Sequence, residues 1–189
     1  MAAEYDAETT DFWDCFPREF FDTFTQSVHG PVLDIGCGPG RDGLLLQERG
    51  LDITCLDASE AMVNLCLEKG LKAVVGDFMQ LPFPDASFNA VWAYTSLLHV
   101  PKAQVDQAFN EISRVLVPHG LLGLGLIEGD TEEYRIGLKN TGVTLPRWFS
   151  YYTKQEVEAL LTKHNFTIKS FVNFQPSKRM YLNFIAQKN

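Results

Sequence analysis

The chain has 189 residues with 46% hydrophobic and 12% aromatic content, which is enough to bury one sizeable core. Its net charge of −8 is uneven, because residues 1–100 hold 16 acidic and 5 basic side chains whereas residues 101–189 hold 8 and 11. An acidic chain without a basic run repels phosphate backbones, and no run of about 18 apolar residues occurs, so neither nucleic acid nor a membrane is expected as a partner. One group of bases is interpreted either as solvated surface or as a contact for a small anion: Arg135, Lys139, Arg147, Lys178 and Arg179.

The amino terminus and the cysteines point to the same cellular compartment. Residues 1–10 are acidic and contain no secretory signal, and Cys15, Cys37, Cys55 and Cys66 form no C-x-x-C pair. We therefore expect reduced thiols and a cytoplasmic location. The four histidines stand singly, so no metal site is expected.

The segment 11–28 precedes the first strand and is rich in aromatic residues. These recur at three- and four-residue steps, which predicts a helix that is interrupted near Pro17. The residues concerned are Phe12, Trp13, Phe16, Phe20, Phe21 and Phe24. The apolar face of this helix must cover another part of the protein.

Residues 32–40, Val-Leu-Asp-Ile-Gly-Cys-Gly-Pro-Gly, predict a buried strand that breaks into a glycine-rich turn before a helix ending near Gly50. Glycines at 36, 38 and 40 allow positive φ and remove side chains, so a ligand can lie against the backbone where the helix begins. The spacing G-x-G-x-G, with Asp34 before it, differs from the dinucleotide pattern G-x-G-x-x-G. A plain strand-to-helix turn is the alternative interpretation.

A second buried strand, residues 51–56, ends at Asp57, whose carboxylate is placed to accept hydrogen bonds from two ribose hydroxyls. No protein partner is expected for this carboxylate. Ser59 is a suitable N-cap for a helix that stops at Gly70. Residues 73–75 form a third strand, which is followed by Gly76-Asp77-Phe78 and a loop broken by prolines. This alternation predicts a parallel, doubly wound sheet.

The second half continues the pattern and then changes it. Residues 88–94 predict a fourth strand, 101–116 an amphipathic helix, and 121–127 a fifth strand, while 128–150 have no regular pattern. A capping box at 153–156 starts a helix that ends near Asn165. Residues 166–174 and 180–187 are separated by a short loop, so they predict an antiparallel hairpin.

Four motifs together resemble the class I S-adenosylmethionine-dependent methyltransferases. They are the acid-x-Gly-x-Gly-x-Gly run at 34–40, Asp57, Gly76-Asp77-Phe78 and Pro118-His119-Gly120, and the likeness is strong over residues 30–127. It implies an α/β, Rossmann-like sheet of seven strands, mostly parallel, with an antiparallel C-terminal hairpin. It also implies S-adenosylmethionine as cofactor and a small molecule as methyl acceptor, with the protein a monomer or a homodimer.

In this family a leading helical segment often closes over the cofactor. We therefore expect residues 1–30 to form a helical lid and residues 31–189 a single domain, with packing against the sheet edge as the alternative for the first segment. Two other functions stay open: a non-catalytic module that binds S-adenosylmethionine, and a nicotinamide-dependent dehydrogenase. The missing G-x-G-x-x-G counts against the dehydrogenase.

The resemblance also implies roles for single residues. Asp77 would accept a hydrogen bond from the adenine amine while the Phe78 amide donates to a ring nitrogen, and Asp57 would hold the ribose. The residues expected to bind the cofactor are Asp34, Gly36, Cys37, Gly38, Gly40, Asp57, Ala58, Met62, Gly76, Asp77, Phe78, Tyr94 and Thr95.

His99 follows the fourth strand, where it could take a proton from the acceptor or simply hydrogen-bond the loop. The structural role is slightly favoured, because methyl transfer to a good nucleophile needs no base. Aromatic faces suit a sulfonium cation, so an acceptor pocket is expected around Trp13, His99, Trp148, Phe149 and Tyr152, with ordinary core packing as the alternative.

Overall fold

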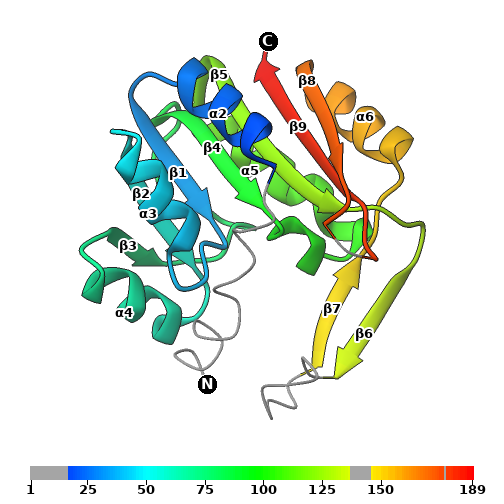
Figure 1. Cartoon of the computed structure of the whole chain (residues 1–189), viewed down its shortest axis with the longest axis horizontal. Coiled ribbons are helices and arrows are strands. Elements are labelled where there is room, and N and C mark those ends of the chain that lie inside the picture. Colours follow the sequence, from blue (N-terminus) through cyan, green and yellow to red (C-terminus); the bar gives the residue numbers. More distant parts are fainter. Residues whose placement is uncertain (1–16, 137–145, 177) are drawn as a thin grey trace.

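A computed structural model describes residues 17–136, 146–176 and 178–189. Its centre is a seven-stranded sheet in the order β3-β2-β1-β4-β5-β9-β8 (Figure 1). The first five strands in this order are parallel, and β9 runs antiparallel to both of its neighbours. The bounds are β1 Pro31–Ile35, β2 Asp52–Asp57, β3 Lys72–Val75, β4 Phe88–Tyr94, β5 Leu116–Ile127, β8 Phe166–Phe174 and β9 Tyr181–Lys188. The predicted fold class is confirmed.

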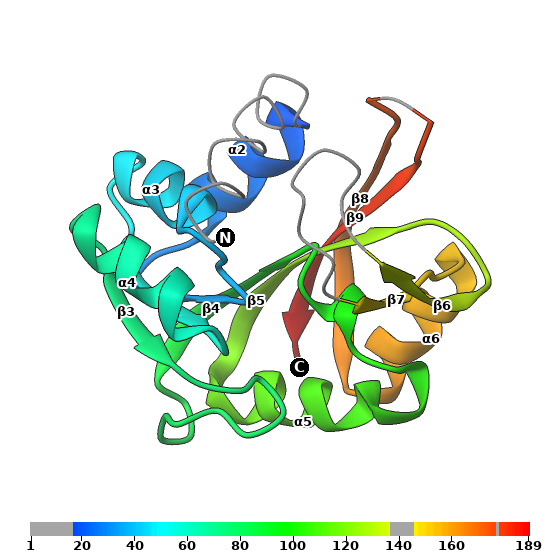
Figure 2. The same ribbon diagram turned by 90° about the horizontal axis from the view of Figure 1, so that it is seen from below.

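Helices cover both faces of this sheet (Figure 2). One face packs against α2 (Arg18–Ser27), α3 (Arg41–Glu48) and α4 (Glu60–Glu68), and the other packs against α5 (Val105–Val115) and α6 (Lys154–Lys163). Apolar side chains of the strands alternate between these two layers, as a doubly wound sheet requires. No helix in the described ranges is long and apolar enough to cross a membrane.

The described part of the aromatic N-terminal segment lies on a face of the sheet. Helix α2 begins directly after Pro17, and the rings of Phe20 and Phe24 lie 5.2 and 4.7 Å from the ring of Trp92 on β4. Gly123 of β5 makes room for this contact, since a Cβ there would lie 2.5 Å from the Trp92 ring. These residues therefore pack on the face of the sheet and not at its edge, which was the alternative expectation for this segment. Residues 1–16 of the predicted lid, Trp13 among them, lie outside the described residues.

Two predicted elements differ in their bounds. Strand β5 begins at Leu116 and contains the expected Pro118-His119-Gly120 turn, where the pairing with β4 shifts register and His119 has a φ of +63°. The motif is therefore an irregularity within a strand. The helix expected to begin after Pro101 starts as a short 3₁₀ turn, Lys102–Gln104, before α5.

The segment predicted to be irregular contains an antiparallel hairpin. Strands β6 (Glu132–Ile136) and β7 (Pro146–Ser150) form a separate two-stranded sheet that projects beyond the main sheet (Figure 1). Tyr134 and Ile136 are 68% and 76% exposed, so the apolar residues of β6 mark no buried face. A strand without a buried face has no clear pattern in the sequence.

Candidate functional site

The glycine-rich turn lies against the end of β2. The amides of Gly36 and Cys37 both donate to the Leu56 carbonyl, at 2.7 and 3.0 Å. A Cβ on Gly36 would lie 2.5 Å from the Ser96 Cβ, whereas one on Gly38 would meet nothing within 4 Å. The turn is thus packed tightly on one side, and at Gly38 its bare backbone faces open space, as a ligand-binding turn requires.

Asp57 is half-buried and holds this turn in place. Its Oδ2 accepts from the Gly38 amide at 2.9 Å, and its Oδ1 accepts from the Ser59 amide at 2.8 Å. The prediction that the carboxylate has no protein partner was therefore wrong, because spacing in the sequence does not show which backbone amides turn toward it. A carboxylate has about four acceptor positions, so two remain for ribose hydroxyls. Ser59 precedes α4 as predicted, but its side chain makes no capping hydrogen bond.

Two buried polar atoms beside the turn have no hydrogen-bond partner among the described residues. They are Oδ2 of Asp34 and Oγ of Ser96, on residues that are only 2% and 4% exposed. Burial, and next the charge of Asp42, raise the pKa of the Asp34 carboxyl well above its ordinary value. A positively charged ligand group beside Asp34 would lower that pKa again and satisfy the oxygen. These groups fit a ligand that carries an ammonium.

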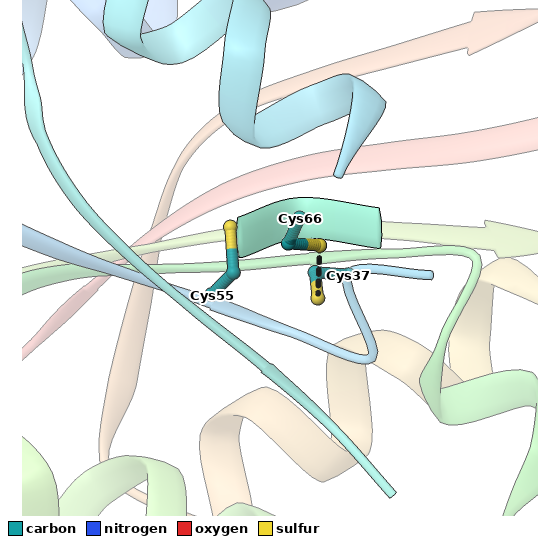
Figure 3. Close-up of side chains that lie close together, drawn as sticks. All are labelled: Cys37, Cys55 and Cys66. Atoms are coloured by element: carbon teal, nitrogen blue, oxygen red, sulfur yellow. Dashed lines mark hydrogen bonds between the residues drawn. The ribbon is translucent and has the colours of Figure 1, made fainter. Parts of the chain in front are cut away.

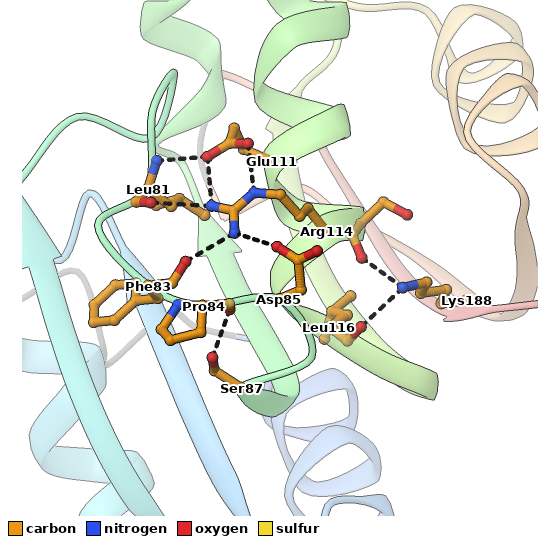
Figure 4. Close-up of polar contacts among 10 residues, drawn as sticks. Leu81, Phe83, Pro84, Asp85, Ser87, Glu111, Arg114, Leu116 and Lys188 are labelled. Carbon is orange, nitrogen blue, oxygen red and sulfur yellow. Dashed lines mark hydrogen bonds and ion pairs between the residues drawn. The ribbon is translucent and has the colours of Figure 1, made fainter.

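The loop after β3 is held by two side chains of helix α5. Arg114 of α5 donates to the carbonyls of Leu81 and Phe83 at 3.0 and 2.8 Å and to Asp85 Oδ1 at 2.8 Å (Figure 4). Glu111 pairs with Arg114 and accepts from the Leu81 amide at 2.7 Å. Sequence reasoning missed both side chains, which lie about thirty residues from this loop and belong to no motif.

This anchored loop presents Asp77 at the same edge of the sheet. The Gly76 amide donates to the Asp57 carbonyl at 3.0 Å, so Asp77, which follows β3, lies beside the end of β2. Oδ1 of Asp77 accepts from the Met79 amide at 2.8 Å, which leaves Oδ2 as an acceptor on an exposed residue. The Gly36 turn, Asp57 and Asp77 therefore line one edge, as the resemblance implies.

His99 lies on the 3₁₀ turn Leu97–His99 that follows β4, and it contacts the hairpin. Its Nδ1 is 2.8 Å from the Trp148 carbonyl, and its ring centroid is 4.8 Å from that of Phe149. A carbonyl only accepts, so Nδ1 carries the proton and the basic lone pair stands on Nε2. Desolvation lowers the pKa of His99 despite its exposed edge and outweighs the opposing hydrogen bond to Trp148. Desolvation thus favours the neutral form of the ring, and the hydrogen bond to Trp148 places its proton on Nδ1.

Further hydrogen bonds fasten the base of the hairpin to the residues after His99. Ser150 Oγ donates toward the Val100 carbonyl at 2.6 Å and accepts from Trp148 Nε1 at 2.9 Å. Glu132 Oε1 accepts from the Lys102 amide at 2.7 Å. Strands β6 and β7 are thus tied to the loop after β4, so the hairpin forms a wall beside His99.

The remaining predicted residues fall into different environments. Trp148 and Phe149 are half-buried beside His99, whereas Tyr152 is 1% exposed and belongs to the core, with Lys102 Nζ 5.0 Å from its ring centroid. Tyr94 is also buried, while Thr95 has a φ of +52° in the turn after β4. Ala58 is exposed beside Asp57, and Met62, Gly76 and Phe78 are half-buried.

Comparison with known proteins agrees with this geometry. Residues 32–120 match a family described as a methyltransferase domain. The chain is 38% identical over 104 residues to a sterol 24-C-methyltransferase of Gibberella zeae, which covers 49% of this chain and 26% of that protein. It is 37% identical over 103 residues to the 27-O-demethylrifamycin SV methyltransferase of Amycolatopsis mediterranei, covering 50% and 37%. The chain thus spans less than half the length of these relatives.

The fold extends the likeness to the whole chain. The structure of a Burkholderia thailandensis 1,6-didemethyltoxoflavin-N1-methyltransferase, with S-adenosylhomocysteine bound, aligns with a TM-score of 0.75 at 22% identity, covering 100% of this chain and 88% of that one. Family match, strand order and site agree. Residues 32–120 therefore match a methyltransferase domain, and the whole chain shares its fold with a methyltransferase of known structure that holds S-adenosylhomocysteine.

Proposed function

We propose that the protein transfers a methyl group from S-adenosylmethionine to a small-molecule acceptor that is held between His99 and the hairpin. The observation that carries this is the convergence at one sheet edge of the bare Gly38 backbone, the Asp57 carboxylate and the orphaned Asp34 oxygen. The names of similar proteins support a small acceptor, since they mention a sterol, a demethylrifamycin and a didemethyltoxoflavin.

On the cofactor side, each residue has a task that its surroundings support. Asp57 accepts from the ribose hydroxyls, Asp77 accepts from the adenine amine, and Asp34 balances the charge of the amino-acid ammonium. When bound, the cofactor supplies a methyl group already activated on a sulfonium. The protein therefore has to hold an acceptor in line with that group and exclude water.

On the acceptor side, Trp148 and Phe149 shield the acceptor, and His99 removes its proton. The neutral imidazole has its lone pair on Nε2, because Nδ1 is committed to the Trp148 carbonyl. It can accept a proton from an O–H or N–H group as the nucleophile forms its new bond. The same hydrogen bond also positions the ring. His99 therefore serves both as the base and as a structural contact, the two roles that the sequence left open.

The first experiment tests the cofactor. We expect the purified chain to bind S-adenosylmethionine and S-adenosylhomocysteine in calorimetric titration, with no competition from NAD or NADP. A thermal shift with NAD and none with either sulfur nucleotide would overturn the assignment.

The second experiment tests transfer. Panels of small hydroxyl, amine and thiol compounds are incubated with the protein and S-adenosylmethionine, and mass spectrometry detects a gain of one methylene unit. A chain that binds the cofactor but forms neither methylated product nor S-adenosylhomocysteine with any panel member would favour the non-catalytic module instead.

A further inference from the structure

Three cysteine side chains gather beneath the glycine-rich turn. Cys37 comes from the turn, Cys55 from β2 and Cys66 from α4, and all three are buried (Figure 3). Their Sγ atoms lie within 4.8 Å of one another, and those of Cys37 and Cys66 are 3.7 Å apart. Methyl transfer as proposed above uses none of these thiols, so the cluster requires an explanation of its own.

The spacing of the sulfur atoms fits a tetrahedral metal ion, and the Cys66 thiol also lies 3.3 Å from the Gly38 carbonyl. A tetrahedral zinc ion with Zn–S bonds of about 2.3 Å holds its sulfur ligands about 3.8 Å apart. The Cys37 and Cys66 sulfur atoms already have this separation at 3.7 Å. The other two distances are below 4.8 Å, so Cys55 needs to approach by only about 1 Å.

Glycine backbone packs closely against the cluster. A Cβ at Gly40 would lie 2.8 Å from Cys66 Sγ, and a Cβ at Gly43 would lie 2.6 Å from Cys55 Sγ. The orphaned Oδ2 of Asp34 is 3.6 Å from that same Gly43 position. A buried carboxylate thus lies near the cluster, but the group of ligand atoms within 4.8 Å of one another consists of the three sulfur atoms.

We propose that Cys37, Cys55 and Cys66 form a buried site for a thiophilic divalent metal ion of the zinc type. Binding replaces three thiol protons with three metal–sulfur bonds, involves no redox change, and releases the protons to solvent. The ion would join the turn, β2 and α4 directly beneath the cofactor. The spacing of the cysteines in the sequence, without any C-x-x-C pair, conceals this site.

The test uses the full chain with Cys15→Ser, because Cys15 lies outside the described residues and would add a fourth thiol. The reduced, metal-free protein is titrated with Cd²⁺, and the sulfur-to-cadmium charge-transfer band is followed in the ultraviolet. We expect saturation at one equivalent with the intensity of three thiolates. Zn²⁺ added to the metal-free protein at a hundredfold excess over its Kd should raise Tm by roughly 5–10 °C, and Cd²⁺ should displace it.

Single variants identify the ligands. Cys66→Ser in the same background should lose about a third of the band and bind Cd²⁺ at least about tenfold more weakly. The Cys15→Ser protein keeps only the three clustered thiols. Its titration therefore shows whether the cluster binds Cd²⁺ even if the Cys66→Ser variant fails to fold. No band at one equivalent, or a Cys37–Cys66 disulfide forming in air with no metal bound before it, would overturn the proposal.

Discussion

The two sides of the candidate site are built by different kinds of contact. On the cofactor side, residues 34–43 and 57–77, hydrogen bonds from main-chain amides hold the turn in place. Three amides of the turn donate to Leu56 and Asp57. On the acceptor side, residues 96–104 and 128–152, polar and aromatic side chains join segments 49 and 50 residues apart, as in the His99–Trp148 and Ser150–Val100 contacts. Substitutions on the first side should therefore change cofactor binding, and those on the second should change turnover.

The sharpest way to separate the two sides is His99→Gln. Glutamine keeps a donor for the Trp148 carbonyl but has no basic nitrogen, so we expect kcat/KM to fall about a hundredfold or more with an unchanged cofactor Kd. In the parent, activity should decline as pH falls through the pKa of His99, which lies below its ordinary value because of desolvation. His29→Gln, on an exposed histidine before β1, is the matched control. A variant that keeps full activity and the same acid limb would refute the proton transfer.

Asp57→Ala should have the next largest effect, and on the cofactor side only. Losing a two-pronged contact to ribose should weaken S-adenosylmethionine binding by about tenfold to several hundredfold in calorimetry. The unliganded protein should also lose about 1–2 kcal/mol, because the Gly38 and Ser59 amides lose their acceptor. Asp57→Asn should lose less cofactor affinity and less stability than Asp57→Ala. If the alanine variant binds S-adenosylmethionine as tightly as the parent protein, Asp57 does not bind the ribose.

Trp148→Ala and Phe149→Ala test the wall of the acceptor pocket. Each removes an aromatic face beside His99, so turnover should fall about tenfold while cofactor affinity changes little. Urea unfolding supplies the control measurement. If unfolding free energy and turnover fall together and to the same extent, the rings serve as core packing and do not form a pocket wall.

The sequence predicts the cofactor side far better than the acceptor side, for a physical reason. Its turn, strand ends and acids follow one another at short spacing, so position along the chain implies position in space. Strand β4 and strand β8 were likewise predicted with the bounds the structure shows, because β4 is a nearly continuous apolar run and β8 mixes apolar and polar residues as a half-exposed strand does. Even here, the spacing did not reveal that Asp57 has two backbone partners.

Contacts between distant segments explain what the sequence could not show. Arg114 has no motif around it, yet it holds the loop before β4 from helix α5, about thirty residues further along the chain. The hairpin was missed because the apolar residues of β6 are exposed and its cohesion comes from pairing with β7. The three buried cysteines lie 18 and 11 residues apart in sequence, a spacing that matches no metal motif.

The smallest expected effect compares two acids that titrate in opposite senses. Burial raises the pKa of Asp42 to about 6, although its hydrogen bond from Trp92 Nε1 pulls it down. Hydrogen bonds from Lys163 and His164 lower the pKa of the exposed Asp106. The contribution of Asp42 to stability is therefore fully present below about pH 3.8 and is lost as pH rises through about 6. The contribution of Asp106 is present above about pH 3.8 and is lost as pH falls.

Asp42→Asn should for this reason stabilise the protein at pH 8 more than at pH 4.5. Asparagine still offers an oxygen to Trp92 Nε1 but carries no charge, and removing that charge also lowers the pKa of the neighbouring Asp34. Urea unfolding of parent and variant at both pH values measures the difference. Asp106→Asn is the matched control on the other face of the sheet and should be destabilising at pH 8, because it loses the attraction to Lys163. Equal stability differences for Asp42→Asn at the two pH values would show that its carboxyl titrates normally in the folded chain.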